Sequence, residues 1–298
     1  MKILLFGKNG QVGWELQRSL APLGKLIAIN STSKDFCGDL ANLAGIKQTI
    51  RKIGPDIIVN AAGYTAVDKA ENEQEMAWLL NAQAPGVLAQ EAKNLNARLI
   101  HYSTDYVFSG NSDQPYLETD YAEPLNVYGR TKLEGEKNIL ISGCSHLIFR
   151  TSWVYATHGN NFIKTILRLA QQRDKLSIVN DQVGSPTGAE LIADITAYTL
   201  LTLRHKPDVS GLYHLTAKGY TSWYDFAKFI LEHVENTNFP QKIRATNISP
   251  ITSIDLPLPA KRPLNSRLNS SKLENVFDLI LPDWQIGVSR TLMEMFDK

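Results

Sequence analysis

The first half of the chain alternates short, wholly apolar runs with longer segments of helical periodicity. The apolar runs span residues 3–6, 26–29, 57–60, 99–102 and 147–149, and the helical segments span 12–20, 43–53, 75–94 and 127–140. Continuous apolar runs of this length are typical of parallel strands that are buried on both faces. Because strands and helices alternate, the pattern predicts an α/β fold with a doubly wound parallel sheet. In such a sheet, ligands bind beyond the carboxyl ends of the strands.

Beyond about residue 150 the pattern changes. Amphipathic helices are predicted over 161–172, 189–203, 223–234 and 286–296, with short strands over 176–179 and 212–215. Residues 248–266 contain Pro250, Pro257, Pro259 and Pro263 and are predicted to form an ordered loop. We therefore expect a first domain over residues 1–152 and a smaller α/β lobe over 153–298. Some segments of that lobe are expected to return to the sheet of the first domain.

Composition excludes several classes of function. The chain has 298 residues, of which 43% are hydrophobic, and its formal net charge is +1. This balance predicts no nucleic-acid partner and no anionic membrane surface. No apolar run reaches the length of a membrane span, and the first one stops at Gly7, too early for a secretion signal, so a cytoplasmic location is expected. Cys37 and Cys144 lie in no metal-binding or redox spacing.

A glycine-rich turn follows the first predicted strand. Gly7, Gly10 and Gly13 are spaced G-x-x-G-x-x-G, and the first helix begins near Gln11 and Val12. Glycine at these positions permits a tight turn, close approach to a pyrophosphate and close packing of helix on strand, while the helix N-terminus attracts phosphate. The pattern predicts a Rossmann-type dinucleotide site in residues 1–152. The alternative is a strand–helix turn that merely favours glycine.

The end of the second predicted strand bears on the choice of cofactor. Asn30 stands where NAD-specific folds often carry a carboxylate for the ribose hydroxyls, and residues 31–34 read Ser-Thr-Ser-Lys. Since no carboxylate there repels a 2′-phosphate, NADPH is favoured and NADH is tolerated. Asp39 and Leu40 are placed near the adenine ring. The alternative is that these are solvated turn residues.

A tyrosine and a lysine form the candidate catalytic pair. Tyr128 and Lys132 are four residues apart and share one face of a predicted helix. Reduction of a ketone needs a proton for its oxygen, and a nearby ammonium stabilises the phenolate that remains. The alternative is a surface pair on an amphipathic helix. The catalytic interpretation of Tyr128 and Lys132 is supported by Thr104 and Asp105. These two residues follow Ser103 at a polar strand end and are suited to polarising a carbonyl. A simple hydroxyl turn is the alternative there.

Taken together, these residues resemble the extended short-chain dehydrogenase/reductases and, more narrowly, the dTDP-4-dehydrorhamnose reductase family. The polar segment Asn60-Ala61-Ala62-Gly63 at the end of the third strand belongs to this resemblance. The other matching segments are residues 6–13, 65–71, 101–108, 124–129, 150–155, 180–182, 184–188, 262–263 and 265–268. The resemblance therefore extends almost from end to end.

The resemblance implies NAD(P)H-dependent reduction of the C4 ketone of dTDP-4-dehydrorhamnose, the last step of dTDP-L-rhamnose synthesis. It implies that Tyr128 donates the proton, that Lys132 positions the nicotinamide ribose, and that Thr104, Asp105 and Trp153 contact the sugar. The cofactor residues that it implies are Gly10, Gln11, Val12, Asn30, Asp39, Leu40, Ala62, Gly63, Thr65 and Tyr102. Asn30 departs from the acidic residue expected of the family.

The resemblance also bears on the second lobe and on assembly. We expect Arg262 to bind the diphosphate of the substrate and Asn161 to supply an amide donor. A loop surface charge is the alternative for Arg262. Members of the family can bind magnesium at a homodimer contact through glutamates that map to Glu15, Glu190 and Glu294. An equally good interpretation is that these three glutamates lie on solvent-exposed faces of helices.

Two other functions are compatible with the same scaffold. A sugar-nucleotide 4,6-dehydratase needs a further acid–base pair, commonly Asp-Glu after the threonine, but here Thr104 and Asp105 are followed by Tyr106. A 4-epimerase would retain NAD tightly. The third possibility is a nucleotide-binding regulatory subunit without catalysis, similar to the beta subunit of methionine adenosyltransferase; intact Thr104, Tyr128 and Lys132 argue against it.

Overall fold

A six-stranded parallel sheet forms the centre of the computed structural model, which describes residues 1–203, 209–235, 237 and 239–296. Its strands are β1 (Lys2–Phe6), β2 (Lys25–Ile29), β3 (Ile57–Asn60), β4 (Arg98–Thr104), β5 (Ser145–Thr151) and β10 (Gly211–His214). They lie in the order β10-β5-β4-β3-β1-β2, with every pair parallel. The chain winds outward from β1 in both directions, so the predicted doubly wound Rossmann-type fold is confirmed.

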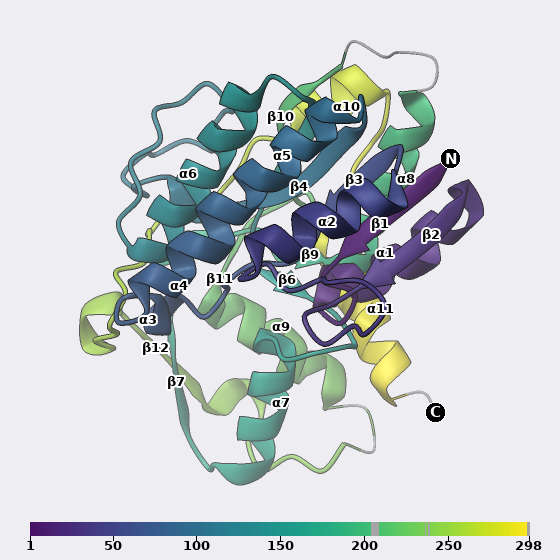
Figure 1. Cartoon of the computed structure of the whole chain (residues 1–298). Coiled ribbons are helices and arrows are strands. Elements are labelled where there is room, and N and C mark those ends of the chain that lie inside the picture. The colour runs from purple at the N-terminus through teal and green to yellow at the C-terminus, as the bar shows by residue number, and fades with distance from the viewer. Residues whose placement is uncertain (204–208, 236, 238, 297–298) are drawn as a thin grey trace.

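Helices cover both faces of this sheet (Figure 1). One face carries α1 (Gln11–Leu20), α8 (Ala189–Thr202) and α10 (Ser271–Phe277); the other carries α2 (Leu43–Ile53), α5 (Ala84–Asn94) and α6 (Val127–Ser142). Alternate residues of β1 point to opposite faces, so Leu5 packs in the cluster that contains Leu16 of α1, while Leu4 packs with Ile46 of α2. Burial on both faces explains why these strands have continuous apolar sequences.

The helix predicted over residues 75–94 is interrupted. It consists of α4 (Gln74–Trp78), the π-helical segment η2 (Leu79–Gln83) and α5. Pro85 has no N–H to donate to the carbonyl of Asn81, one turn earlier. The wider turn lets the buried side chain of Asn81 accept from the Tyr64 N–H at 2.8 Å and donate to the Tyr64 carbonyl at 3.0 Å. The interruption therefore anchors the loop that follows β3. The short elements beside it are η1 (Ala21–Leu23), α3 (Val67–Ala70) and η3 (Asp105–Val107).

A second layer of structure lies beyond the carboxyl edge of the sheet, where α7 and α9 occupy the lower part of Figure 1. Its core is formed by α7 (Phe162–Gln172), α9 (Trp223–Val234), α11 (Trp284–Phe296), β7 (Leu176–Val179) and β12 (Ile248–Ile251). The remaining elements are β6 (Val154–Tyr155), β8 (Val183–Gly184), β9 (Thr187–Gly188), β11 (Thr221–Ser222), η4 (Ala245–Asn247) and η5 (Ser253–Asp255).

The structure corrects the sequence-based expectation in this layer. Residues 248–251 were expected in a loop but form β12, which pairs in parallel with β7. Pro250 is tolerated because this is a two-stranded sheet, in which each strand has a free edge. Helix α10 had no counterpart in the prediction. As expected, one late segment, β10, returns to the central sheet beside β5. The division of the chain at residue 152 stays a prediction.

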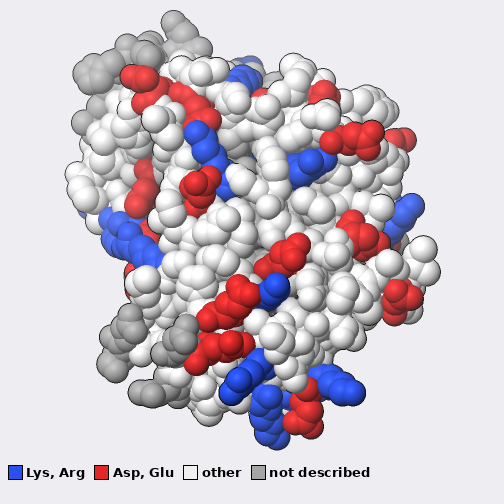
Figure 2. Space-filling model, turned by 180° about the vertical axis from the view of Figure 1, so that it is seen from behind, with Lys and Arg blue, Asp and Glu red and all other residues white. Residues whose placement is uncertain are grey.

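Acidic and basic side chains are interspersed on the face that Figure 2 shows, in keeping with the balanced composition. Among the described residues, no helix is both long enough and apolar enough to cross a membrane.

A buried ion pair joins α6 to β5. Arg150 donates from Nε to Glu136 Oε1 at 2.9 Å and from Nη2 to Glu136 Oε2 at 2.6 Å, and both side chains are at most 5% exposed. The bidentate geometry compensates part of the cost of removing both charges from water. Because Lys132 lies one turn before Glu136, this pair also fixes how α6 presents the candidate residues Tyr128 and Lys132 to the sheet.

Replacement of Glu136 should therefore be costly. Glu136→Gln leaves the Arg150 guanidinium buried without its counter-charge, and we expect the free energy of unfolding to fall by about 3–5 kcal/mol. Urea denaturation followed by circular dichroism measures this. Glu134→Gln is the matched control on the same helix: its partner Lys137 is 55% exposed, so we expect a change within about 0.5 kcal/mol. Equal effects of the two variants would contradict the prediction.

Candidate active site

A cavity of ≈ 740 Å³ opens at the carboxyl ends of the central strands and extends to the second lobe. It runs from the glycine-rich turn after β1 to the first residue of α9. The predicted site residues that line it are Gly7, Gly10, Gln11, Val12, Asn30, Asp39, Leu40, Ala62, Gly63, Thr65, Tyr102, Thr104, Asp105, Tyr128, Lys132 and Trp153. The fold thus brings together predicted site residues up to 146 positions apart in the chain, from Gly7 to Trp153.

The glycine-rich turn has the geometry that a phosphate cradle requires. Gly7 has φ +85°, and a Cβ there would lie 2.7 Å from the carbonyl carbon of Ala61 on the neighbouring strand end. A Cβ on Gly13 would collide with the carbonyl oxygen of Gly7. Gly13 does not line the cavity, and its glycine is required for packing α1 against the turn. The N-terminus of α1 at Gln11 opens onto the cavity and offers unpaired N–H groups to an anion.

Asn30 and its neighbours form the far end of the cavity. Asn30 Oδ1 accepts from the Ser33 hydroxyl at 2.8 Å and from the Thr32 hydroxyl at 3.3 Å. Asp39 Oδ1 accepts from the Ala41 N–H at 3.0 Å. At the end of β2, where a carboxylate would face the ribose hydroxyls, the cavity is lined by the neutral side chains of Asn30 and Ser31.

Tyr128, Thr104 and Asp105 meet at the centre of the cavity. Helix α6 begins just before Tyr128 because Asn126 caps it, with its side chain accepting from the Gly129 N–H at 2.8 Å. Burial raises the pKa of Tyr128 to about 12, and a hydrogen bond with Thr104 opposes the rise. Thr104 also donates to Asp105 Oδ1 at 3.0 Å. Burial raises the pKa of Asp105 to about 6, although Ser266 and Thr104 donate to it.

Lys132 lies one helical turn from Tyr128 and is buried. Its Nζ donates to the carbonyl of Tyr102 at 2.5 Å. Burial lowers the pKa of Lys132 to about 8, and Glu136 on the same helix opposes the decrease. The buried Ser103 Oγ and Thr151 Oγ1 also line the cavity and have no partner within the described structure. The arrangement combines a phenol, an ammonium and hydroxyl donors in a partly enclosed space, which suits proton transfer to a carbonyl oxygen.

An aromatic pair from the second lobe lines one side of the cavity. The indoles of Trp153 and Trp223 stack with centroids 3.5 Å apart and an interplanar angle of 10°. Trp153 has φ +49°, and Gly184 leaves room for its indole, since a Cβ on Gly184 would lie 2.6 Å from Cε2. Sequence reasoning missed Trp223, because no local pattern connects it with Trp153. It also missed Thr151, which is the last residue of β5 and lies two residues beyond the end of the strand predicted over 147–149.

Sequence comparison identifies the family. The family described as the RmlD substrate binding domain matches residues 1–296. The chain belongs to this family. A relative named dTDP-4-dehydrorhamnose reductase, from Escherichia coli strain K12, is 57% identical over 296 residues, which are 99% of this chain and 98% of the relative.

Solved structures of RmlD-family relatives have the same architecture over the whole chain. A dTDP-4-dehydrorhamnose reductase from Clostridium acetobutylicum is 34% identical, with a TM-score of 0.88 and 99% of each chain covered. The enzyme of the same name from Bacillus anthracis, solved in complex with NADP, is 32% identical, with a TM-score of 0.87 and coverage of 98% and 99%.

In this RmlD-family chain, Arg262 and Asn161 lie outside the cavity lining. Arg262 Nη2 pairs with Asp68 Oδ2 at 2.9 Å, and its guanidinium also bonds to Tyr106, which does line the cavity. Asn161 caps α7 and donates to Gln11 Oε1 at 3.0 Å. Both residues thus join the second lobe to the first domain. Their predicted roles toward substrate stay predictions.

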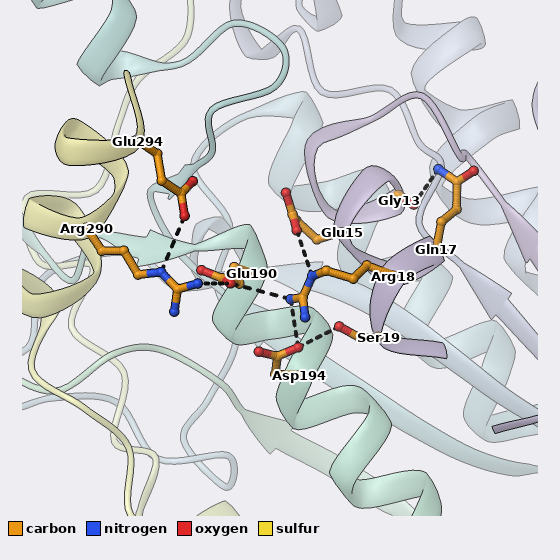
Figure 3. Close-up of polar contacts among 9 residues, drawn as sticks. All are labelled: Gly13, Glu15, Gln17, Arg18, Ser19, Glu190, Asp194, Arg290 and Glu294. Atoms are coloured by element: carbon orange, nitrogen blue, oxygen red, sulfur yellow. Dashed lines mark hydrogen bonds and ion pairs between the residues drawn. The ribbon is translucent and has the colours of Figure 1, made fainter. Parts of the chain in front are cut away.

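The three glutamates proposed for magnesium lie together on α1, α8 and α11, but arginines separate them (Figure 3). Arg18 contacts Glu15 at 3.5 Å and Glu190 at 3.6 Å. Arg290 contacts Glu190 at 2.9 Å and Glu294 at 3.4 Å. Arg18 also pairs with Asp194 at 2.9 Å, so the two guanidinium groups neutralise only part of the negative charge, but they lie between the glutamates, where a shared cation would have to bind. Within the described residues, no group of three or more His, Cys, Asp or Glu side chains is suited to holding a metal. The arrangement of these side chains therefore does not support the magnesium contact that was expected through Glu15, Glu190 and Glu294.

The raised pKa of Asp105 predicts how stability depends on pH in this RmlD-family protein. Between pH 4 and 6 the unfolded carboxyl loses its proton before the buried one, so the free energy of unfolding falls as pH rises. Asp105→Asn removes this effect. Relative to the wild type, the variant should gain stability from pH 4 to 7 by up to about 3 kcal/mol. Urea denaturation at several pH values measures the difference.

Asp255→Asn provides a control of opposite sign. Hydrogen bonds from Thr252 lower the pKa of this exposed carboxyl, so its contribution to stability is present above the ordinary pKa of 3.8 and is lost as pH falls below it. A difference between Asp105→Asn and the wild type that stays constant from pH 4 to 7 would refute the assigned cause.

Proposed function

We propose that this protein is an NAD(P)H-dependent reductase that converts the C4 ketone of dTDP-4-dehydrorhamnose to the alcohol of dTDP-L-rhamnose. The observation that carries the proposal is the placement of Tyr128, Thr104 and Lys132 in one cavity with the glycine-rich turn. The names of relatives up to 57% identical over nearly the whole chain support the substrate. The NADP complex of the Bacillus anthracis relative supports the cofactor class.

The residues of the chain account for the proton and the charge in this reaction. NAD(P)H, when bound, supplies the hydride to C4. Because burial raises the pKa of Tyr128 to about 12, the phenol is protonated at neutral pH and donates to the ketone oxygen. A protonated Lys132 stabilises the phenolate that remains, and the Thr104 hydroxyl does so when its proton turns from Asp105 Oδ1 to the phenolate. The stacked indoles of Trp153 and Trp223 form an apolar wall of the cavity in which this step takes place.

The geometry favours reduction over the two alternatives on the same scaffold. A dehydratase needs a second carboxylate after Asp105, but that position holds Tyr106, which stacks edge-on against Tyr128 at 5.8 Å. A silent regulatory subunit has no need for a buried, hydrogen-bonded Tyr128 and a buried Lys132, whose desolvation destabilises the fold.

Loss of the Tyr128 hydroxyl should abolish most of the activity. With dTDP-4-dehydrorhamnose as substrate, we expect NADPH consumption at ~340 nm by the wild type, and a kcat lower by about 10²–10⁴-fold in Tyr128→Phe, as for loss of a general acid. Tyr121→Phe, at a tyrosine that is 85% exposed, should retain full activity. A folded, nucleotide-binding wild type without turnover would instead favour the regulatory-subunit hypothesis.

We further propose that NADPH is preferred to NADH. Asn30 and Ser31 present neutral polar groups to the end of the cavity where the 2′-phosphate would lie. The Asn30 side chain is held in place by Ser33 and Thr32, whose hydroxyls donate to it. Residue 30 itself carries no charge to oppose a phosphate, and the carboxylate that lines this end of the cavity, Asp39, accepts a hydrogen bond from the Ala41 N–H.

A charge introduced at residue 30 tests the preference. Asn30→Asp keeps both acceptor bonds, but adds a negative charge beside the 2′-phosphate. We expect the ratio of kcat/KM for NADPH to that for NADH to fall by about tenfold or more, equivalent to ~1.4 kcal/mol of discrimination. Asn94→Asp adds the same charge at an exposed position of α5, away from the cavity, and should leave the ratio unchanged. An unaltered ratio in Asn30→Asp would refute the assignment of this end of the cavity.

The homodimer and the magnesium-dependent contact stay predictions. The proposed reaction does not depend on either of them.

A further inference from the structure

His101 is a buried, titratable side chain that the proposed reaction does not use. It lies on β4, directly beside Asn60 of β3 in the sheet register, and is 1% exposed. Its two ring nitrogens face two polar neighbours. Nδ1 lies 3.1 Å from Asn60 Nδ2, and Nε2 lies 3.4 Å from Lys132 Nζ. The imidazole thus bridges the end of β3 and the candidate catalytic lysine.

The hydrogen bonds of Asn60 determine which ring nitrogen carries the proton. Asn60 Oδ1 accepts from the Ala62 N–H at 3.2 Å, which directs the amide nitrogen of Asn60 toward His101. An amide nitrogen only donates, so His101 Nδ1 must accept. In a neutral imidazole the proton then resides on Nε2, which faces Lys132. The opposite amide orientation would place two donors, Asn60 Nδ2 and the Ala62 N–H, against each other.

We propose that His101 is a positioning residue for Lys132, locked by Asn60 in the Nε2–H tautomer so that a donor, and not an acceptor, faces the lysine nitrogen. An N–H directed at an ammonium is unfavourable, whereas the same N–H can donate to a neutral amine. Lys132 therefore has a single acceptor described on this side, the carbonyl of Tyr102. His101 holds the lysine at that carbonyl and favours the release of its proton.

The surrounding charges are consistent with this role. Burial, and secondly the charge of Lys132, holds the pKa of His101 well below 6.5, so the imidazole stays neutral at neutral pH. On α6, Glu136 opposes the lowering of the Lys132 pKa by burial, and its charge is shared with Arg150 of β5. From β3, the neighbour is the neutral Asn60. His101 is thus an uncharged group in contact with Lys132 Nζ. In the proposed role it lowers the pKa of Lys132, which Glu136 raises.

The tautomer can be measured without any assay of activity. In the wild-type protein labelled with ¹⁵N-histidine, long-range ¹H–¹⁵N correlation spectra distinguish a protonated Nε2 from a protonated Nδ1 for each of the 6 histidines. The His101 signals are assigned by their absence from the spectrum of His101→Asn. We expect His101 to be neutral and protonated on Nε2 from pH 6 to 9. A proton on Nδ1, or a charged ring in this range, would overturn the proposal.

The effect of His101 on Lys132 is tested by measuring kcat/KM as a function of pH. This second experiment rests on the proposed reductase function. With the pKa of Lys132 at about 8, kcat/KM should decline above that pH as the ammonium is lost. His101→Gln places a carbonyl acceptor near Nζ and should move this limb upward by about one pH unit, or ~1.4 kcal/mol. His101→Asn is the matched control: it retains an acceptor for Asn60 and also removes the opposing N–H, but it is too short to place an acceptor at Lys132, so the limb should move upward by less than in His101→Gln.

The outcomes separate the two proposals. An alkaline limb that stays in place in an active His101→Gln enzyme, or that moves equally in both variants, would refute the positioning role. If the wild type has no turnover, the proposed reductase function fails, while the spectra still decide the tautomer. If His101→Gln does not fold, the wild-type spectra remain the deciding measurement.

Discussion

Burial of the central sheet on both faces is the constraint that locates everything else in this molecule. All four residues of β3 and nearly all of β4 are buried, so most of their polar side chains are found where a partner is available, with Ser103 Oγ as an exception beside the cavity. Such partners are concentrated toward the carboxyl edge. There Asn60 contacts His101 and accepts from the Ala62 N–H, His101 also contacts Lys132, and Thr104 accepts from the Tyr106 N–H. The cavity forms between this edge of the sheet and the second lobe, whose Trp153 and Trp223 line it.

The same burial that shapes the cavity also makes its chemistry costly. Desolvation raises the pKa of Tyr128 and Asp105 and lowers that of Lys132, so each charged form is disfavoured in the folded protein. The Glu136–Arg150 pair one turn beyond Lys132 supplies a fixed charge that counters part of this effect. Stability is therefore reduced at the cavity and maintained by the apolar clusters on the two faces of the sheet. Perturbed groups gathered in one cavity are typical of a functional site.

Sequence patterns predicted the elements whose burial is uniform. The run at residues 57–60 coincides with β3, because a strand buried on both faces is predominantly apolar; only its last residue, Asn60, is polar. The helix over residues 75–94 was predicted as continuous, since hydrophobic periodicity does not register a local widening such as η2, which depends on Asn81 bonding to Tyr64. Strand β12 was missed because its pairing partner β7 is 72 residues away, Leu176 to Ile248, and Pro250 suggests a loop.

The candidate site likewise combines contacts that local sequence predicts with contacts that only the tertiary structure decides. Tyr128 with Lys132, and Gly7 with Gly10, are related by short spacings along the chain, so helix geometry and turn geometry alone specify their relation. Pairs from distant segments were beyond such reasoning: Trp153 with Trp223, Arg262 with Asp68, and His101 with Asn60. Their contacts depend on how layers pack and on strand register. Local sequence specifies which residue types stand at a strand end or on a helix face. Which of them meet, and in which protonation state, depends on the desolvated surroundings that the folded chain alone creates.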